Sequence, residues 1–212
     1  MKKLFITLAR LLGYEVIDQN NFSSPTLNKK LNEDLSTLNQ KSIVLPLGEV
    51  KITRKVNSLL LVVRINTEIE IWDQNKKRLF EQPKIELSIR SLNSLFKSID
   101  FFKKKNPNLE IKTILVDDNS SEINLNRIKN LIKNQDAEIV QLVHEKFKTA
   151  IKEQKNKETF SNLASLKESF EIGKDRGNDL IFFLEDDYLH FESMIEEMIS
   201  SFERITSQIG ED

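Results

Sequence analysis

The stretch Leu180–Tyr188, which reads LIFFLEDDY, determines how the rest of the chain is interpreted. Its apolar residues Ile181–Leu184 form a continuous run, which is typical of a strand buried on both faces of a parallel α/β sheet. Three carboxylates, Glu185, Asp186 and Asp187, follow directly. We therefore expect a strand that ends in acidic groups, at the edge where open α/β sheets bind their ligands.

The adjacent aspartates have two chemical interpretations. Neighbouring carboxylates repel each other unless a cation or hydrogen-bond donors lie between them. Their hard oxygen atoms suit Mg²⁺ or Mn²⁺, particularly where a phosphate shares the metal ion. The simpler alternative is a strand followed by the acidic first turn of a helix, where aspartate caps the helix and favours its dipole. This stretch alone leaves both interpretations open.

Composition excludes several classes of function. The chain has 212 residues, with 32 Lys and Arg against 33 Asp and Glu, so its net charge of −1 gives no reason to expect a nucleic-acid partner. It has no cysteine and only 2 histidines, which excludes disulfides and leaves little material for a zinc site or a Ser/His triad. No apolar run reaches the roughly 18 residues of a membrane span, and no signal peptide is evident. We expect a cytoplasmic protein.

From residue 59 onward, predicted strands alternate with amphipathic helices. Strands are expected at 59–63, 111–116, 138–143 and 180–184, and helices at 84–105, 122–134, 160–172 and 191–205. Gly173 and Gly177 are expected to break the third helix. This alternation predicts an α/β fold with a mostly parallel sheet, right-handed crossovers and flanking helices. Acidic residues follow two of the strands, at Asp117–Asp118 and Asp186–Asp187, so both clusters should meet at one rim.

An N-terminal extension, residues 1–57, is expected before the main domain, residues 58–212. Residues 2–12 place leucines and Phe5 on one helical face beside Lys2, Lys3 and Arg10, and Gly13 is a plausible stop. Such a helix can pack on its own domain or lie on an anionic membrane surface. The second alternative predicts a peripheral contact at the inner face of the membrane. A short strand is expected near residues 50–56.

Two motifs resemble those of a known family. The strand and loop ILVDDNSS at 114–121 and the later FFLEDDY at 182–188 resemble the GT-A glycosyltransferases of the family 2 type, over roughly residues 59–205. In that family the first motif is a strand ending in a D-D-x-S-like turn. The second is the DXD motif, followed by a helix. The resemblance implies a GT-A-like sheet that binds a nucleotide-diphosphate sugar.

The resemblance also implies roles for single residues. Asp118, in the motif with Asp117, would bind the base of the donor, a uracil. Asp187 would bind the Mn²⁺ or Mg²⁺ that bridges the diphosphate, and Asp186 would contact the metal, its bound water or the ribose. The loop from Arg64 to Thr67 would wrap the base, although the family's usual sequence there is closer to P-x-Y-N. A lysine of 146–157 would approach the diphosphate.

The implied reaction moves the sugar to a glycan, lipid-linked or other cell-envelope acceptor. The metal neutralises charge on the leaving diphosphate, and an inverting enzyme also needs a general base. No base is identified, because Glu192, Glu196 and Glu197 fall on a solvated helical face. Only 25 residues follow Asp187, so the acceptor half is expected to be missing. A fragment, a truncated product or a half completed by another chain are the possibilities.

Other functions remain open. A phospho-receiver domain also has an acidic pair and an acidic strand end, but in a different strand order and with a later lysine-bearing strand. A sugar nucleotidyltransferase would need a glycine-rich loop after the first strand, and residues 64–78 contain no glycine. A non-catalytic donor-binding fragment is a third alternative. Tyr188 and Trp72 could stack on a base or sugar. His144 and His190 are expected to be surface residues without partners.

Overall fold

The computed structural model describes residues 7–9, 11–13, 52–68, 82–151 and 157–209. Contacts divide the chain into two units. One is Lys55–Phe202, and the other joins Met1–Arg54 to Glu203–Asp212. In the second unit, the backbone N–H groups of Thr53 and Arg54 both donate to Ser207 Oγ at 3.0 Å. The first unit contains the whole sheet.

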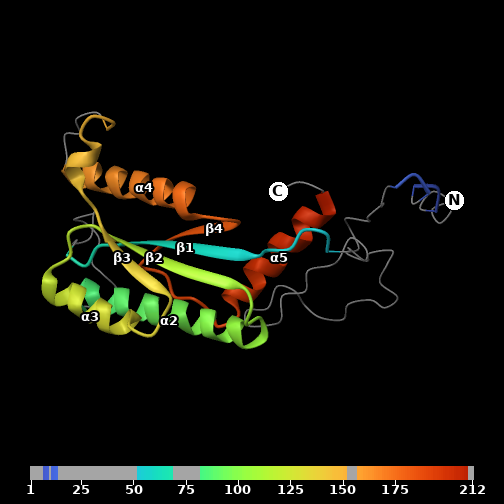
Figure 1. Cartoon of the computed structure of the whole chain (residues 1–212), viewed down its shortest axis with the longest axis horizontal. Coiled ribbons are helices and arrows are strands. Elements are labelled where there is room, and N and C mark those ends of the chain that lie inside the picture. Colours follow the sequence, from blue (N-terminus) through green and yellow to red (C-terminus); the bar gives the residue numbers. More distant parts are fainter. Residues whose placement is uncertain (1–6, 10, 14–51, 69–81, 152–156, 210–212) are drawn as a thin grey trace. The chain divides into compact units, whose positions relative to one another are not determined.

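The sheet has four parallel strands in the order β3-β2-β1-β4. The strands are β1 Ser58–Ile65, β2 Glu110–Asp117, β3 Ala137–Gln141 and β4 Leu180–Glu185. Figure 1 shows how the chain moves outward from β1 to β3 and then returns to the other side of β1. The connections on the two sides of β1 therefore diverge, which makes the carboxyl ends of β1 and β4 the topological switch point of the sheet. The predicted parallel α/β sheet is confirmed.

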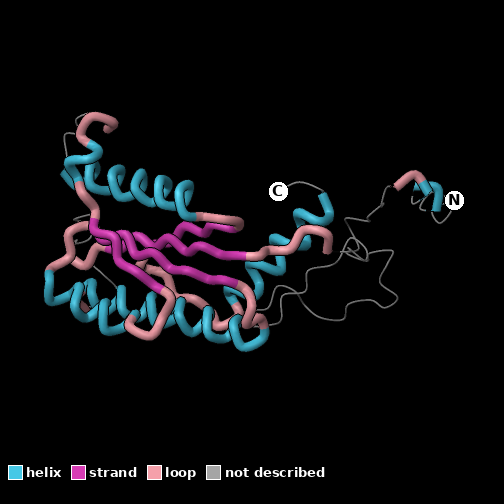
Figure 2. The backbone as a smooth tube through the Cα atoms, in the orientation of Figure 1, coloured by secondary structure: helices cyan, strands magenta, loops and turns pink. Residues whose placement is uncertain are grey.

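Helices cover the sheet on both faces. They are α2 Lys84–Lys105, α3 Glu122–Ile132, the 3-10 turn η1 His144–Phe147, α4 Lys157–Arg176 and α5 Met194–Ile209. Figure 2 shows α2 and α3 along one face and α4 along the other. The predicted bounds of α2 are confirmed, because its apolar residues repeat at helical spacing from end to end. The other helices begin or end within a few residues of their predicted bounds.

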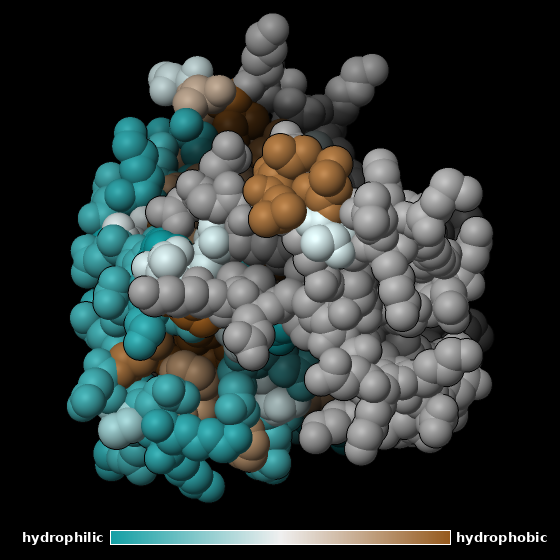
Figure 3. Space-filling view, turned by 90° about the vertical axis from the view of Figure 1, so that its right-hand side faces the viewer, coloured by the Kyte–Doolittle hydropathy of each residue, from teal (hydrophilic) through white to brown (hydrophobic). Residues whose placement is uncertain are grey.

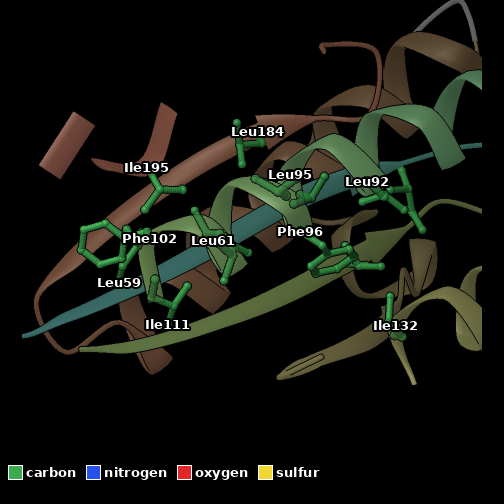
Figure 4. Packing of buried hydrophobic residues seen from close by; sticks show 14 of the residues in the cluster. Leu59, Leu61, Leu92, Leu95, Phe96, Phe102, Ile111, Ile132, Leu184 and Ile195 are labelled. Carbon is green, nitrogen blue, oxygen red and sulfur yellow. The ribbon is translucent and has the colours of Figure 1, made fainter. Parts of the chain in front are cut away.

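The central strand β1 supports both faces of the core. Leu59 and Leu61 pack with α2 in the larger cluster, whereas Leu60 and Val62 pack with Ile172 of α4. Figure 4 shows the larger cluster, in which side chains of β1, β2 and β4 meet those of α2 and α5. Successive side chains of a strand point to opposite faces, so a continuous apolar run suits this position.

The strand that dominates the sequence is not the central one. β4 pairs with β1 alone among the described strands, and Phe183 is 38% exposed. The prediction that this run is buried on both faces was therefore wrong. The reason is its terminal place in the sheet, where α4 covers it only in part. Phe170 meets Phe183 edge-on, with ring centroids 4.9 Å apart.

Gly173 lies inside α4 and does not break it, which corrects a second prediction. A Cβ there would come within 2.8 Å of Phe183 Cζ. Gly177 does follow the last residue of α4, and a Cβ there would lie 2.5 Å from Ile181 Cδ1 of β4. The glycines are thus explained by the close approach of α4 to β4 and not only by helix termination.

The N-terminal predictions are described only in part. Residues 7–9 and 11 are helical, and Gly13 has a φ of +83°, so a glycine does end this helix. Residues 52–57 form no strand, so the expected strand near 50–56 is wrong for its described part. Residues 14–51 and 69–81, including Trp72, lie outside the described residues. Among the described helices, none is long and apolar enough to cross a membrane.

Candidate functional site

Acidic residues from two strands meet at the carboxyl rim of the sheet. Parallel register aligns Asp117 of β2 with Ile65 of β1, and Arg64 of β1 with Glu185 of β4. The acids that follow β2 and those that follow β4 therefore flank the end of β1, around the switch point. The structure thus brings the two acidic clusters to one rim, as the predicted alternation of strands and helices implies.

Strand alternation sends neighbouring acids to opposite faces of the sheet. Asp117 continues the side of Leu115, which packs in the cluster with α2, and Asp118 continues the side of Val116, which packs with α4. Both aspartates are buried, with exposed fractions of 1% and 5%. Two adjacent carboxylates therefore have different surroundings, although the sequence does not distinguish them.

Asp186 is held by the first turns of α2. Lys84 Nζ donates to Asp186 Oδ1 at 2.8 Å, and Ser88 Oγ donates to Asp186 Oδ2. Asp186 is only 6% exposed. Because both oxygen atoms already have donors and the charge is paired with Lys84, a metal ion or ribose would have to compete with these contacts.

Asp117 lies on the same side of the sheet, but no basic side chain in the described part of the chain forms an ion pair with it. The backbone N–H of Ser120 donates to Asp117 Oδ2 at 3.3 Å, and Oδ1 has no hydrogen-bond partner among the described residues. Burial raises the pKa of Asp117, the hydrogen bonds from Ser120 oppose this, and the charges of Asp118 and Asp186 raise the pKa further. This carboxyl therefore binds a proton more readily than an exposed aspartate does.

Asp118 contacts the elements that follow β3. Ser161 Oγ of α4 donates to Asp118 Oδ2 at 2.7 Å, and His144 Nε2 lies 2.9 Å from the same hydroxyl. His144 Nε2 is also 3.0 Å from Asp118 Oδ1, but without the alignment of a hydrogen bond, so Oδ1 has no hydrogen-bond partner in the described part of the chain. The prediction that His144 is a surface residue without partners was wrong. Its place directly after the third predicted strand was the signal that could have located it at the rim.

Arg64 and Thr67 connect segments of the rim. Arg64 pairs with Glu185 and donates to Asn162 Oδ1 at 2.7 Å, so β1, β4 and α4 are joined at this point. The backbone N–H of Thr67 donates to Ser120 Oγ at 3.1 Å. Both residues predicted to surround the base therefore lie at the rim, where their described contacts are with the protein itself.

A carboxylate already occupies the start of α3. Ser121 is at the N-cap position, but its side chain makes no capping hydrogen bond. Instead, Glu68 Oε1 accepts the backbone N–H of Ser121 at 3.0 Å and the amide of Asn124 at 2.9 Å. The hydrogen bonds from Ser121 lower the pKa of Glu68. The loop after β1 is thus fastened to the loop after β2, in which Asn119 has a φ of 64°.

Asp187, directly after Asp186, is exposed. No three His, Asp or Glu side chains in the described ranges are grouped so that they could hold a metal ion by themselves. Mg²⁺ and Mn²⁺ are nevertheless commonly bound by one or two carboxylates together with phosphate oxygens and water. Asp187 fits that arrangement, because its carboxylate is open to solvent while the carboxylate of Asp186 is engaged.

The predicted basic stretch gives no described diphosphate ligand. Lys146 pairs with Glu168 at 2.7 Å and Glu171 at 2.9 Å, and the hydrogen bonds that it donates to these carboxylates raise the pKa of Lys146. Lys148 pairs with Glu145 at 2.6 Å. Lys152 and Lys155 lie outside the described residues. The described lysines thus stabilise the solvated surface of η1 and α4.

A hollow of about 150 Å³ lies away from these acids. Its lining includes Ile111, Thr113 and Asp136, which lie toward the amino ends of β2 and β3. Ligands of open α/β sheets bind at the opposite ends of the strands. We therefore place the candidate site at the acidic rim.

No protein-family model, curated protein or solved structure matches the chain. Function is therefore inferred from the sheet topology and from the chemistry of the rim.

Proposed function

We propose that the chain is the donor-binding domain of a GT-A-like glycosyltransferase of the family 2 type. The observation that carries this proposal is the convergence of Asp118 and Asp187 on the two sides of β1, at the switch point of a parallel sheet. The donor is a nucleotide-diphosphate sugar, for which we propose a uracil base. The acceptor is a glycan or lipid-linked molecule of the cell envelope.

Strand order favours this proposal over the phospho-receiver alternative. The order β3-β2-β1-β4 is part of the 3-2-1-4-5-6 order of dinucleotide-binding sheets, whereas receiver domains have the order 2-1-3-4-5. In a receiver, the first strand carries the acidic pair at its end. Here β1 ends in Arg64 and Ile65, and the acidic pair, Asp117 and Asp118, lies at the end of β2.

Different residues of the rim bind different parts of the donor. Asp118 accepts an N–H group of the base, and Asp187 holds Mn²⁺ or Mg²⁺ against the diphosphate. When bound, the metal ion offsets charge on the leaving diphosphate. Asp186 stays paired with Lys84 and Ser88, so its role here is to fix the turn that presents Asp187. The general base is not assigned.

We also propose a peripheral contact of residues 2–12 with the inner face of the membrane. Leu8, Leu11 and Leu12 are 55%, 80% and 68% exposed, and Figure 3 shows hydrophobic residues exposed on the face that it presents. The sequence places Lys2, Lys3 and Arg10 in the same segment, and basic residues next to leucines suit an anionic lipid surface. Sedimentation with anionic vesicles tests this contact, and replacing Leu11 and Leu12 by glutamate should abolish it.

The donor site is tested by calorimetric titration of UDP with and without Mn²⁺. We expect binding that Mn²⁺ strengthens, and we expect Asp187→Asn to remove the effect of the metal. Asp175→Asn is the matched control, because it makes the same change at an exposed aspartate near the far end of α4. Binding that is absent under every metal condition would contradict the proposal.

A further inference from the structure

The contacts around Asp118 suggest a function for two residues that no motif indicates. His144 Nε2, Ser161 Oγ and Asp118 Oδ2 form a chain with steps of 2.9 and 2.7 Å. Because the hydroxyl proton of Ser161 goes to Asp118, its lone pair accepts a hydrogen from Nε2 of His144. This assigns a proton to Nε2 and directs it at Ser161 rather than at Asp118 Oδ1.

The second carboxylate oxygen of Asp118, Oδ1, is therefore able to accept a hydrogen bond. Oδ1 is buried and has no hydrogen-bond partner among the described residues, a condition that is costly for a carboxylate. His144 lies only 3.0 Å from this oxygen, with a side chain that is 32% exposed. A ring with that exposure can move off Oδ1 without unpacking the core. The arrangement thus offers a buried acceptor next to a movable donor.

We propose that His144 and Ser161 make Asp118 specific for the imide edge of a base, which is a ring N–H group beside a carbonyl group. This inference rests on the proposed nucleotide site. Oδ1 of Asp118 accepts the imide N–H of the base, and the imidazole moves to donate its Nε2–H to the neighbouring carbonyl. Ser161 keeps Oδ2 occupied and holds the carboxylate in place. His144 and Ser161 are then specificity-determining residues.

The Asp118–His144 pair distinguishes uracil from cytosine, and the hydroxyl of Ser161 distinguishes uracil from guanine. Uracil presents an N–H between two carbonyl groups, which matches an acceptor beside a donor. Cytosine presents a lone pair to Asp118 and an amino group to His144, so both contacts become repulsive. Guanine presents a carbonyl and two adjacent N–H donors, which would bind best to a carboxylate with both oxygen atoms free. The hydroxyl of Ser161 on Oδ2 disfavours that bidentate contact.

The test measures the affinities of UDP, CDP and GDP by calorimetry on the full chain and four variants. In His144→Phe, UDP affinity should fall by about five- to ten-fold, the effect of one hydrogen bond. CDP affinity should not fall and should rise slightly, because the repulsive contact between His144 and the amino group of cytosine is removed. His144→Gln retains an N–H donor and should restore most of the loss. Ser161→Ala should narrow the preference for UDP over GDP. Ser193→Ala, which removes a hydroxyl bound to Glu197, is the control, and circular dichroism checks folding.

The outcomes separate this inference from the proposed function. Equal losses of affinity for all three nucleotides in His144→Phe would overturn the inference. Equal gains of affinity would also overturn it, because the imidazole of His144 would then only block access to Asp118. UDP binding that depends on Mn²⁺ and Asp187, but shows no base preference set by His144, would support the proposed donor site and overturn the inference about His144. A preference set by His144 without dependence on Mn²⁺ or Asp187 would support the inference and contradict the metal site. Absence of all nucleotide binding would overturn both.

Discussion

The two aspartate pairs of the rim have the same sequence but different environments. At the end of β2, Asp117 and Asp118 are both buried, and one oxygen atom of each has no hydrogen-bond partner in the described part of the chain. After β4, Asp186 is buried and paired with Lys84, while Asp187 is exposed. The first pair is a buried acceptor site, and the second is one anchored and one open carboxylate.

The difference shows what decides the chemistry of adjacent acids. Alternation along a strand separates the two side chains, and the helices on each face then supply or withhold donors. On the α2 face, Lys84 neutralises Asp186 but not Asp117. On the α4 face, Ser161 supplies one donor to Asp118. We therefore expect the first pair to bind neutral N–H donors and the second pair to bind a cation through Asp187.

The largest expected effect comes from breaking the anchored acid. Lys84→Met removes the lysine that pairs with Asp186 and leaves the buried carboxylate without an opposite charge. This change should lower the free energy of unfolding by about 3 kcal/mol. Urea denaturation followed by circular dichroism measures the loss. The double variant Lys84→Met with Asp186→Asn should recover most of it, because the buried charge is then absent. A loss in the double variant as large as in the single one would contradict the ion-pair explanation.

The second prediction concerns the carboxylate that joins the loops after β1 and β2. Glu68→Ala removes the acceptor for the N–H of Ser121 at the start of α3 and should cost about 1 kcal/mol, the usual value of a helix cap. Glu192→Ala, at another exposed carboxylate, is the control and should have no such cost.

The effect of Glu68 should depend on pH in a defined direction. Because its hydrogen bonds lower the pKa of Glu68 in the folded state below 4.5, its contribution is present above that value. The contribution is lost as pH falls through the folded-state pKa. The difference between wild type and Glu68→Ala should therefore shrink in acid. A difference that grows as pH falls would contradict this explanation.

The smallest expected effect lies in the buried pair. Burial raises the pKa of Asp117 above 3.8, so the folded state favours the neutral acid, and ionisation lowers stability as pH rises through the folded-state pKa. Asp117→Asn removes this ionisation and keeps an oxygen acceptor for Ser120. The variant should be slightly more stable than wild type at pH 7, and this gain should disappear below pH 3.8. If Asp117→Asn instead becomes less stable relative to wild type as pH rises, this explanation of the raised pKa is contradicted.

Hydrophobic pattern was sufficient to predict most of the fold. The apolar spacing of 84–105 located α2, and the runs at 59–63 and 111–116 located the two inner strands, because burial on one or both faces leaves a direct periodic signal. Pattern alone misplaced β4 as a fully buried strand. The extent to which a neighbouring helix covers an edge strand is a tertiary property that the run itself does not encode.

The site was predictable only where its residues follow strands. Asp118 and Asp187 could be located from their positions after apolar runs, but their partners could not. Ser88 contacts Asp186 from 98 residues away, and Ser161 contacts Asp118 from 43 residues away. Serine and lysine are common on helix surfaces, so their types carry no signal until the fold brings them to the rim.

The most direct test of the central claim separates the two pairs with two ligands. Binding of uridine, which has a base but no diphosphate, and the Mn²⁺ dependence of UDP binding are measured by calorimetry for Asp118→Asn and Asp187→Asn. We predict that Asp118→Asn weakens uridine binding and retains the Mn²⁺ effect on UDP, while Asp187→Asn retains uridine binding and loses the Mn²⁺ effect. Loss of both properties in each variant, or of neither, would contradict the division of roles between the two pairs.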